Sequence, residues 1–149
     1  MITNGMGLLH SAPIEDMIDH KAREHGVSYG LTEAGYDIRI KQEMLLSESN
    51  RFALASTIER FQMPKTLAAV VHDKSTWARR GLSVFNTVIE PGWFGWLTLE
   101  LVYHGQGEIH IPAGVGIAQV LFHHLEEPAD YGDGKYQNQK DEPVGPITA

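Results

Sequence analysis

The stretch that decides the fold is "LSVFNTVIEPGWFGWLTLEL", residues 82–101, which directly follows the basic segment "KSTWARRG", residues 74–81. In "WLTLEL" the residues alternate as in a β-strand, which places Trp96, Thr98 and Glu100 on one face. The leucines occupy the other face, and we expect that face to be buried in the core. An isolated buried charge is costly, so Glu100 either faces solvent, the simpler interpretation, or forms one site with the basic segment.

Segments with the same period of two occur along most of the chain, separated by Gly, Pro, Asn and Ser. In chain order they are YDIRIKQEMLL (36–46), RFALAST (51–57), TLAAVVH (66–72), LSVFNTVIE (82–90), WLTLELVYH (96–104), GEIHI (107–111) and GIAQVLFHHL (116–125). A series of short, closely spaced strands predicts an all-β barrel or sandwich.

One segment near the N-terminus has a helical period instead. Ser11 can cap a helix there, Pro13 suits its first turn, and Gly26 would end it. The apolar residues at helical spacing are Ile14, Met17, Ile18 and Ala22. The pattern predicts a short N-terminal helix over residues 11–24, followed by a mainly β chain.

Length and composition limit the classes of protein that the chain can represent. Its 149 residues, 42% of them hydrophobic, fit a single globular domain over residues 1–149. The absence of cysteine excludes disulfides, a thiolate nucleophile and a cysteine-based zinc site. A formal net charge of −7 argues against broad binding to nucleic acid or an anionic membrane. No signal-peptide pattern or run of about 18 apolar residues occurs, so we expect a cytoplasmic protein.

Residues 126–149 differ from the rest, because they are polar, rich in Gly and Pro, and without an apolar period. They predict a flexible C-terminal arm, and a disordered terminus is the simpler interpretation. Alternatively, the cation, aromatic ring and amides of "KYQNQ", residues 135–139, suit an arm that closes over a ligand.

The basic segment combines cations with hydroxyl groups. Lys74, Ser75 and Arg79 carry the ammonium, hydroxyl and guanidinium donors that a phosphate chain requires. A solvated surface loop is the alternative. The segment is not a Walker loop, and the eight histidines show no H-E-x-x-H or similar metal-ligand spacing.

Taken together, these segments resemble the dCTP deaminase and dUTPase family. The resembling segments, in family order, are AGYDIRI (34–40), RFALASTIERFQMPKTLAAVV (51–71), KSTWARRG (74–81), VIEPGWFGWLTLEL (88–101), PAGVGIAQVLF (112–122) and KYQNQ (135–139). In the deaminase branch the strand after P-G-W ends in a glutamate, which matches Glu100. The C-terminal motif R-G-x-x-G-F-G-S of dUTPases is missing, so the chain looks closer to the deaminases.

The resemblance implies a catalytic role for several residues. Glu100 would deprotonate a water for attack at C4 of the cytosine in dCTP, giving dUTP and ammonia. Arg79 would steer and partly neutralise Glu100, and Ser75 would help to position the water and the ring. The implied substrate-binding residues are Lys74, Ser75, Lys135 and Gln139 for the triphosphate, Thr87, Val88 and Glu90 near the base and sugar, and Gln119, Tyr131 and Tyr136 as further contacts.

The resemblance also implies a dUTPase-like distorted β-barrel and a homotrimer whose sites lie between subunits. Magnesium would be held mainly by the triphosphate, and no zinc is expected, because zinc-dependent deaminases need cysteine ligands. The chain departs from the family in three places. The interval from Arg79 to the "IEPGW" turn is shorter and lacks a T-A pair, Glu90 replaces an aspartate, and Lys74 replaces an arginine.

Other functions remain open from the residues alone. A dUTPase, or a bifunctional enzyme that forms dUMP, would use Glu90 to orient water toward phosphorus. A non-catalytic nucleotide-binding regulator would bind nucleotide without turnover.

Overall fold

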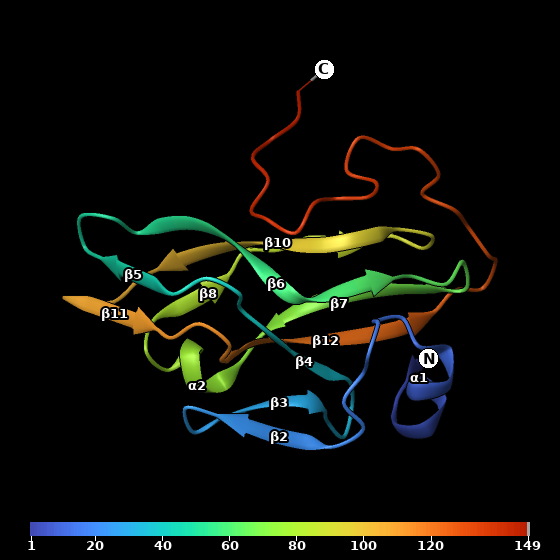
Figure 1. The fold of residues 1–149 in the computed structure, drawn as a ribbon, viewed down its shortest axis with the longest axis horizontal. Helices are drawn as coiled ribbons and strands as arrows, with labels where there is room; N and C mark the ends of the chain where they lie inside the picture. Colours follow the sequence, from blue (N-terminus) through green and yellow to red (C-terminus); the bar gives the residue numbers. More distant parts are fainter. Residues whose placement is uncertain (149) are drawn as a thin grey trace.

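The computed structural model describes residues 1–148; Ala149, the last residue of the predicted arm, lies outside the described residues. The chain is mainly β-structure with a short N-terminal helix (Figure 1), which confirms the predicted all-β class. The elements are β1 (Ile2–Thr3), α1 (Gly5–Ser11), β2 (Lys21–Glu24), β3 (Val27–Leu31), β4 (Tyr36–Arg39), β5 (Met44–Ser47), β6 (Phe52–Gln62), β7 (Leu67–Asp73), α2 (Ser75–Ala78), β8 (Leu82–Val84), β9 (Val88–Ile89), β10 (Phe94–Tyr103), β11 (Glu108–Ile111) and β12 (Gly116–His124). No helix within residues 1–148 has the length and apolar character needed to cross a membrane.

The strands form antiparallel sheets of different sizes. The largest is seven-stranded, in the order β2-β3-β4-β12-β7-β9 with β1 paired to β12. A three-stranded sheet has the order β6-β10-β8, and β11 pairs with β5. In the view of Figure 1, β6 and β10 lie above β7 and β12, and the β2–β3 hairpin lies below them.

The hydrophobic core takes residues from all the large strands. Ile38 of β4, Ile117 and Phe122 of β12, and Leu99 and Leu101 of β10 are fully buried. Burial of such apolar surface is the dominant favourable term in folding. The prediction that the leucine face of β10 lies in the core is therefore confirmed at these two positions.

The helix predicted over residues 11–24 is wrong. The helix of the structure, α1, lies before this segment, and Ala12 ends it with a left-handed φ of 46°. Ala12 precedes Pro13, whose ring disfavours helical conformation in the residue before it. Ile14 forms a β-bridge with Phe61, and the end of the segment becomes β2. Pairing with distant strands thus overrides the local helical spacing.

The pairing of β10 with β6 is irregular next to Glu100. The register shifts between Trp96 and Thr98, and the backbone N–H of Leu97 donates to the Thr57 hydroxyl at 3.1 Å. Such β-bulges bend and twist a strand, and they are frequent next to active sites.

Residues 126–148 contain no helix or strand and run along β10 on its outer side (Figure 1). Gln139 forms a parallel β-bridge with Gly95, and the Trp93 indole N–H donates to the Tyr136 carbonyl at 2.7 Å. A Cβ at Gly95 would lie 2.6 Å from the Gln139 nitrogen, so only glycine permits this close approach. The tail therefore has a defined path over the body of the chain, and its flexibility stays a prediction.

Candidate active site

A cavity of about 670 Å³ opens between β10, the loop that joins β8 to β9, and the C-terminal tail. This volume lies within the range of small-molecule sites. Of the residues predicted from sequence, the cavity is lined by Glu100 together with Thr87, Val88, Glu90, Tyr131, Tyr136 and Gln139. The cavity thus brings together one predicted catalytic residue and much of the predicted binding set.

Glu100 is half-buried in the wall of this cavity. Its Oε2 atom is buried and has no hydrogen-bond partner within residues 1–148. Burial raises the pKa of the Glu100 carboxyl above its ordinary value, because desolvation penalises the charged form, and a backbone hydrogen bond partly opposes the rise. A carboxyl with a raised pKa and an unsatisfied oxygen, placed in a cavity, is typical of a group that exchanges protons with a ligand.

Asn86, in the loop between β8 and β9, also lines the cavity and was not predicted as a site residue. Its Oδ1 accepts the backbone N–H of Glu100 at 3.2 Å, and its Nδ2 donates to the Thr98 carbonyl at 3.0 Å. Asparagine is common in loops between strands, so nothing in the sequence distinguished this residue.

The tail closes the cavity through contacts with Thr98, which lies on the same strand as Glu100. The Thr98 hydroxyl accepts hydrogen bonds from the Gln139 side-chain amide and from the Val144 backbone N–H, the latter at 3.0 Å. The Tyr131 hydroxyl accepts the backbone N–H of Tyr136 at 3.2 Å. One buried threonine therefore holds two points of the tail against the cavity.

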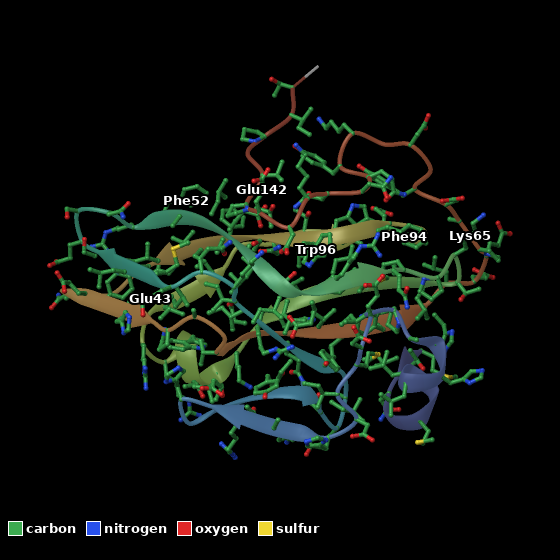
Figure 2. All side chains as sticks on the ribbon, in the orientation of Figure 1. Glu43, Phe52, Lys65, Phe94, Trp96 and Glu142 are labelled. Atoms are coloured by element: carbon green, nitrogen blue, oxygen red, sulfur yellow. The ribbon has the colours of Figure 1, made fainter. Side chains whose placement is uncertain are left out.

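Large apolar side chains are exposed at the cavity or next to it in the chain: Phe52 and Val88 line the cavity, and Phe85 precedes the lining residue Asn86. We call these three residues the apolar rim. Their exposed fractions are 55%, 71% and 50%. Figure 2 shows Phe52 and Glu142 on the same side of the molecule, where the tail crosses β10. Apolar side chains gathered at a surface in this way are typical of an interaction surface.

The catalytic candidates Ser75 and Arg79 are not among the residues that line the cavity. They are exposed at the two ends of the single-turn helix α2, between β7 and β8. The turn is anchored by Trp77, which is 2% exposed and donates its indole N–H to the Gly116 carbonyl at 2.7 Å. Within one chain the structure does not bring these two residues into the Glu100 cavity.

Lys74, which precedes α2, is already paired inside the chain. Its ammonium group forms an ion pair with the Asp37 carboxylate and donates to the Ser28 hydroxyl at 2.8 Å. Only 13% of the Lys74 side chain and 4% of the Asp37 side chain are exposed. The ion pair ties the basic segment to β4.

Two further predicted residues lie outside the lining of the cavity. Gln119 of β12 donates to the Thr32 hydroxyl at 2.9 Å. Lys135 is exposed in the tail, with its ammonium 5.5 Å from the ring centre of Tyr136. Both have contacts that explain their positions without a ligand.

The part of the chain that the structure describes contains no group of three or more His, Cys, Asp or Glu residues placed to hold a metal ion. The carboxylates that line the cavity are Glu90 and Glu100. Mg²⁺ usually binds through one or two carboxylates together with phosphate oxygens and water. This donor set fits a magnesium ion that arrives with a phosphorylated ligand.

Solved structures with a similar fold include dUTPases. The Staphylococcus bacteriophage 80alpha dUTPase with dUPNHPP aligns with a TM-score of 0.58 and 16% identity, over 87% of this chain and 84% of its own. A mutant of the dUTPase from phage phi11 of S. aureus, whose structure reveals the coordination of a structural Mg(II) ion, aligns with a TM-score of 0.58 and 17% identity, over 77% of this chain and 88% of its own. The chain therefore has the dUTPase-like fold.

Sequence comparison identifies the family of proteins with this fold to which the chain belongs. Residues 15–125 match the family described as dCTP deaminase-like. The dCTP deaminase of Chloroflexus aggregans is 34% identical over 90% of this chain and 89% of its own length. That of Herpetosiphon aurantiacus is 37% identical over 85% and 86%. The protein belongs to the dCTP deaminase-like family.

Proposed function

We propose that this protein is a dCTP deaminase, which hydrolyses dCTP to dUTP and ammonia. The observation that carries the proposal is Glu100, whose buried, unpartnered oxygen lies in the wall of a ligand-sized cavity. Relatives that bear the name dCTP deaminase align over most of the chain, which supports the same assignment.

In the proposed reaction Glu100 acts first as a general base and then as a proton carrier. Its carboxylate takes a proton from water, and the resulting hydroxide attacks C4 of the cytosine ring. The proton passes to the ring nitrogen N3, and the hydroxyl proton then moves to the amino group. The C4–N bond breaks, ammonia leaves, and C4 becomes the carbonyl of uracil. Because burial raises the pKa of Glu100, the group holds a proton more readily than an ordinary carboxyl.

We place the other two catalytic residues, Arg79 and Ser75, on a neighbouring subunit of a homotrimer. The cavity is lined by none of the residues of the basic segment, and the apolar rim beside it is exposed in the single chain. In the assembled protein, Arg79 of one subunit neutralises Glu100 of the next, and Ser75 positions the water and the ring. Burial of the apolar rim between subunits stabilises that arrangement.

The triphosphate is bound by Lys74, Lys135 and Gln139, with Mg²⁺ bound chiefly by the phosphate oxygens, whose charge it neutralises. An ammonium group has three donors, and Lys74 uses two of them for Asp37 and Ser28. The third is available for a phosphate oxygen. The remaining proposed contacts to base and sugar are Thr87, Val88, Glu90, Gln119, Tyr131 and Tyr136.

The test is to incubate the purified protein with dCTP and Mg²⁺ and to separate the nucleotides by chromatography, with Glu100→Gln in parallel. We expect dUTP and equimolar ammonia from the wild type. We expect a rate at least about 100-fold lower from the variant, the usual scale of a general base. Glu108→Gln, an exposed carboxylate of β11, is the matched control and should retain the wild-type rate. Binding of dCTP without product would contradict the proposal.

A bifunctional enzyme that also forms dUMP is the second candidate. It is favoured by Glu90, a second carboxylate in the same cavity, and by the dUTPase fold. In that case dCTP would give dUMP, and Glu90→Gln would stop the reaction at dUTP. Consumption of dUTP alone would indicate a dUTPase.

A further inference from the structure

The strand that carries Glu100, β10, is no longer paired with β8 at the position of Glu100. β8 pairs with β10 only up to Val84, and the next strand, β9, pairs with β7 instead. Phe85 makes one more ladder contact, because its backbone N–H donates to the Glu100 carbonyl at 2.7 Å. Beyond it, the backbone of the loop no longer follows β10.

The side chain of Asn86 continues the ladder where the backbone stops. It accepts the backbone N–H of Glu100 at 3.2 Å and donates to the Thr98 carbonyl at 3.0 Å. A primary amide supplies one acceptor and two donors, so it can satisfy both groups at once. An aspartate at this position could accept but not donate, and an alanine could do neither.

We propose that Asn86 is a positioning residue that fixes the backbone of Glu100 and the cavity wall formed by Thr87 and Val88. For its catalytic readouts, the inference depends on the proposed deaminase function. Asn86 acts by holding β10 and the β8–β9 loop at one separation, so that the Glu100 carboxyl and the wall that faces it keep a fixed geometry.

β10 is also paired along its other edge, so the positioning role of Asn86 differs from a general contribution to the stability of the strand. Glu100 pairs there with Leu54 of β6, and the strand buries Leu99 and Leu101 in the core. Loss of the Asn86 amide therefore leaves the strand in place and loosens only one side. A general base must lie within hydrogen-bond distance of the proton that it takes, so small displacements reduce turnover strongly.

The charge environment makes aspartate an informative substitution. The titratable groups that line the cavity are Glu90 from the loop after β9, Glu100 from β10, and Tyr131 and Tyr136 from the tail. Within the described residues 1–148, no lysine or arginine lines the cavity. A carboxylate introduced at residue 86 would add a like charge next to Glu100, which disfavours ionisation of Glu100.

The kinetic test compares Asn86→Ala and Asn86→Asp with the wild type, with dCTP as substrate. For Asn86→Ala we expect kcat to fall about tenfold while KM changes less than about threefold, as expected for lost positioning. For Asn86→Asp we expect the acid limb of the pH profile of kcat/KM to move up by about one pH unit. Asn4→Ala, which removes the amide that donates to the Glu33 carbonyl, is the matched control and should change neither.

A second readout does not require turnover. In protein labelled with ¹³C at the glutamate carboxyls, the Glu100 signal is assigned as the one missing in Glu100→Gln. We expect Asn86→Asp to raise the titration midpoint of that signal. We expect Asn86→Ala to speed hydrogen exchange of the Glu100 amide at least about tenfold, because its acceptor is lost.

The outcomes separate the positioning role from the proposed function. If dCTP is not turned over but the Glu100 titration and exchange respond as expected, the deaminase function fails and the positioning role of Asn86 stands. If kcat, pH profile, titration and exchange all match those of Asn4→Ala, the positioning role is wrong. A lower melting temperature with unchanged titration and pH profile would equally overturn it, because it would indicate a structural role only.

Discussion

Glu100 and Lys74 are both ionisable and at least half-buried, yet Lys74 has partners in its own chain whereas one oxygen of Glu100 has none within residues 1–148. Lys74 has partners within its own chain, an ion pair to Asp37 and a hydrogen bond to Ser28. Glu100 has a buried oxygen with no partner within residues 1–148. The basic segment is therefore held in place by contacts within its own chain. The Glu100 cavity, in contrast, contains a carboxyl oxygen without a partner.

The contrast indicates that the Glu100 cavity, and not the basic segment, needs a partner from outside the chain. The basic segment presents Ser75 and Arg79 outward at the ends of an anchored turn. The cavity presents a carboxyl with one unpartnered oxygen, and no lysine or arginine within residues 1–148 lines it. A buried charge is tolerated when a partner is supplied, and the exposed Arg79 is a cation of the kind that the cavity lacks. This complementarity supports a site shared between subunits.

The largest expected effect is the loss of the cation that completes the site. Arg79→Ala should lower kcat for dCTP by about 100-fold or more, the scale of losing one preorganised electrostatic contact. Arg80→Ala is the matched control, because the Arg80 guanidinium lies 5.0 Å from the ring centre of Trp77 in the same chain. Its activity should stay within about threefold of the wild type, since a cation–π contact contributes about 1 kcal/mol. Equal losses in the two variants would contradict a specific role for Arg79.

The next effect concerns the ion pair between Lys74 and Asp37. Lys74→Met leaves the buried Asp37 carboxylate unpaired and should lower the free energy of unfolding by about 3 kcal/mol, measured by urea denaturation. Lys21→Met, which removes the exposed pair with Glu33, should cost less than about 1 kcal/mol. If both variants lose the same small amount, the ion pair of the basic segment is not a structural anchor.

A smaller effect is expected at the tail. Thr98→Val keeps the size of the side chain but removes the hydroxyl that accepts from Gln139 and from the Val144 N–H. We expect KM for dCTP to rise about fivefold, corresponding to about 1 kcal/mol for a lost hydrogen bond, with kcat little changed. Amide exchange of Val144 should become faster in the same variant. An unchanged KM with faster exchange would show that the tail position does not contribute to binding.

The smallest effect is a pH-dependent difference in stability. Because burial raises the folded-state pKa of Glu100, its neutral form is favoured, and that stability is lost as the pH rises through the raised pKa. In the Arg79→Ala background, which lacks the proposed partner, Glu100→Gln cannot ionise, so the melting temperature of the double variant should exceed that of Arg79→Ala alone at pH 8. At a pH below the ordinary glutamate pKa the two proteins should melt together. A double variant that is less stable at pH 8 would show that the ionised carboxylate has a stabilising partner other than Arg79.

Much of the fold follows from local sequence. The alternation in residues 96–101 predicts β10 and its buried leucine face, and both are found. The helix over residues 11–24 fails because Ile14 pairs with Phe61, a partner 47 positions away in the chain that no local period reveals. The same apolar residues can fall at helical spacing and still be buried in an extended segment.

Part of the candidate site could be predicted from residue type. Glu100 stands out as a carboxylate on a strand, its match to the family motif implies a catalytic role that stays a prediction, and the structure places it in the cavity. Asn86 and the ion pair of Lys74 with Asp37 were not predictable, because both depend on contacts between segments distant in the sequence. Local sequence therefore indicates a candidate reactive group more readily than the groups that hold it in place.

The most direct test of a site shared between subunits is to mix two inactive variants. Glu100→Gln and Arg79→Ala chains are unfolded together, refolded at equal concentration, and assayed with dCTP, with native mass spectrometry to count mixed trimers. In a closed ring of three subunits, random mixing restores about a quarter of the sites, so about a quarter of wild-type activity should return. Mixed trimers with no activity above that of either variant alone would contradict the shared site.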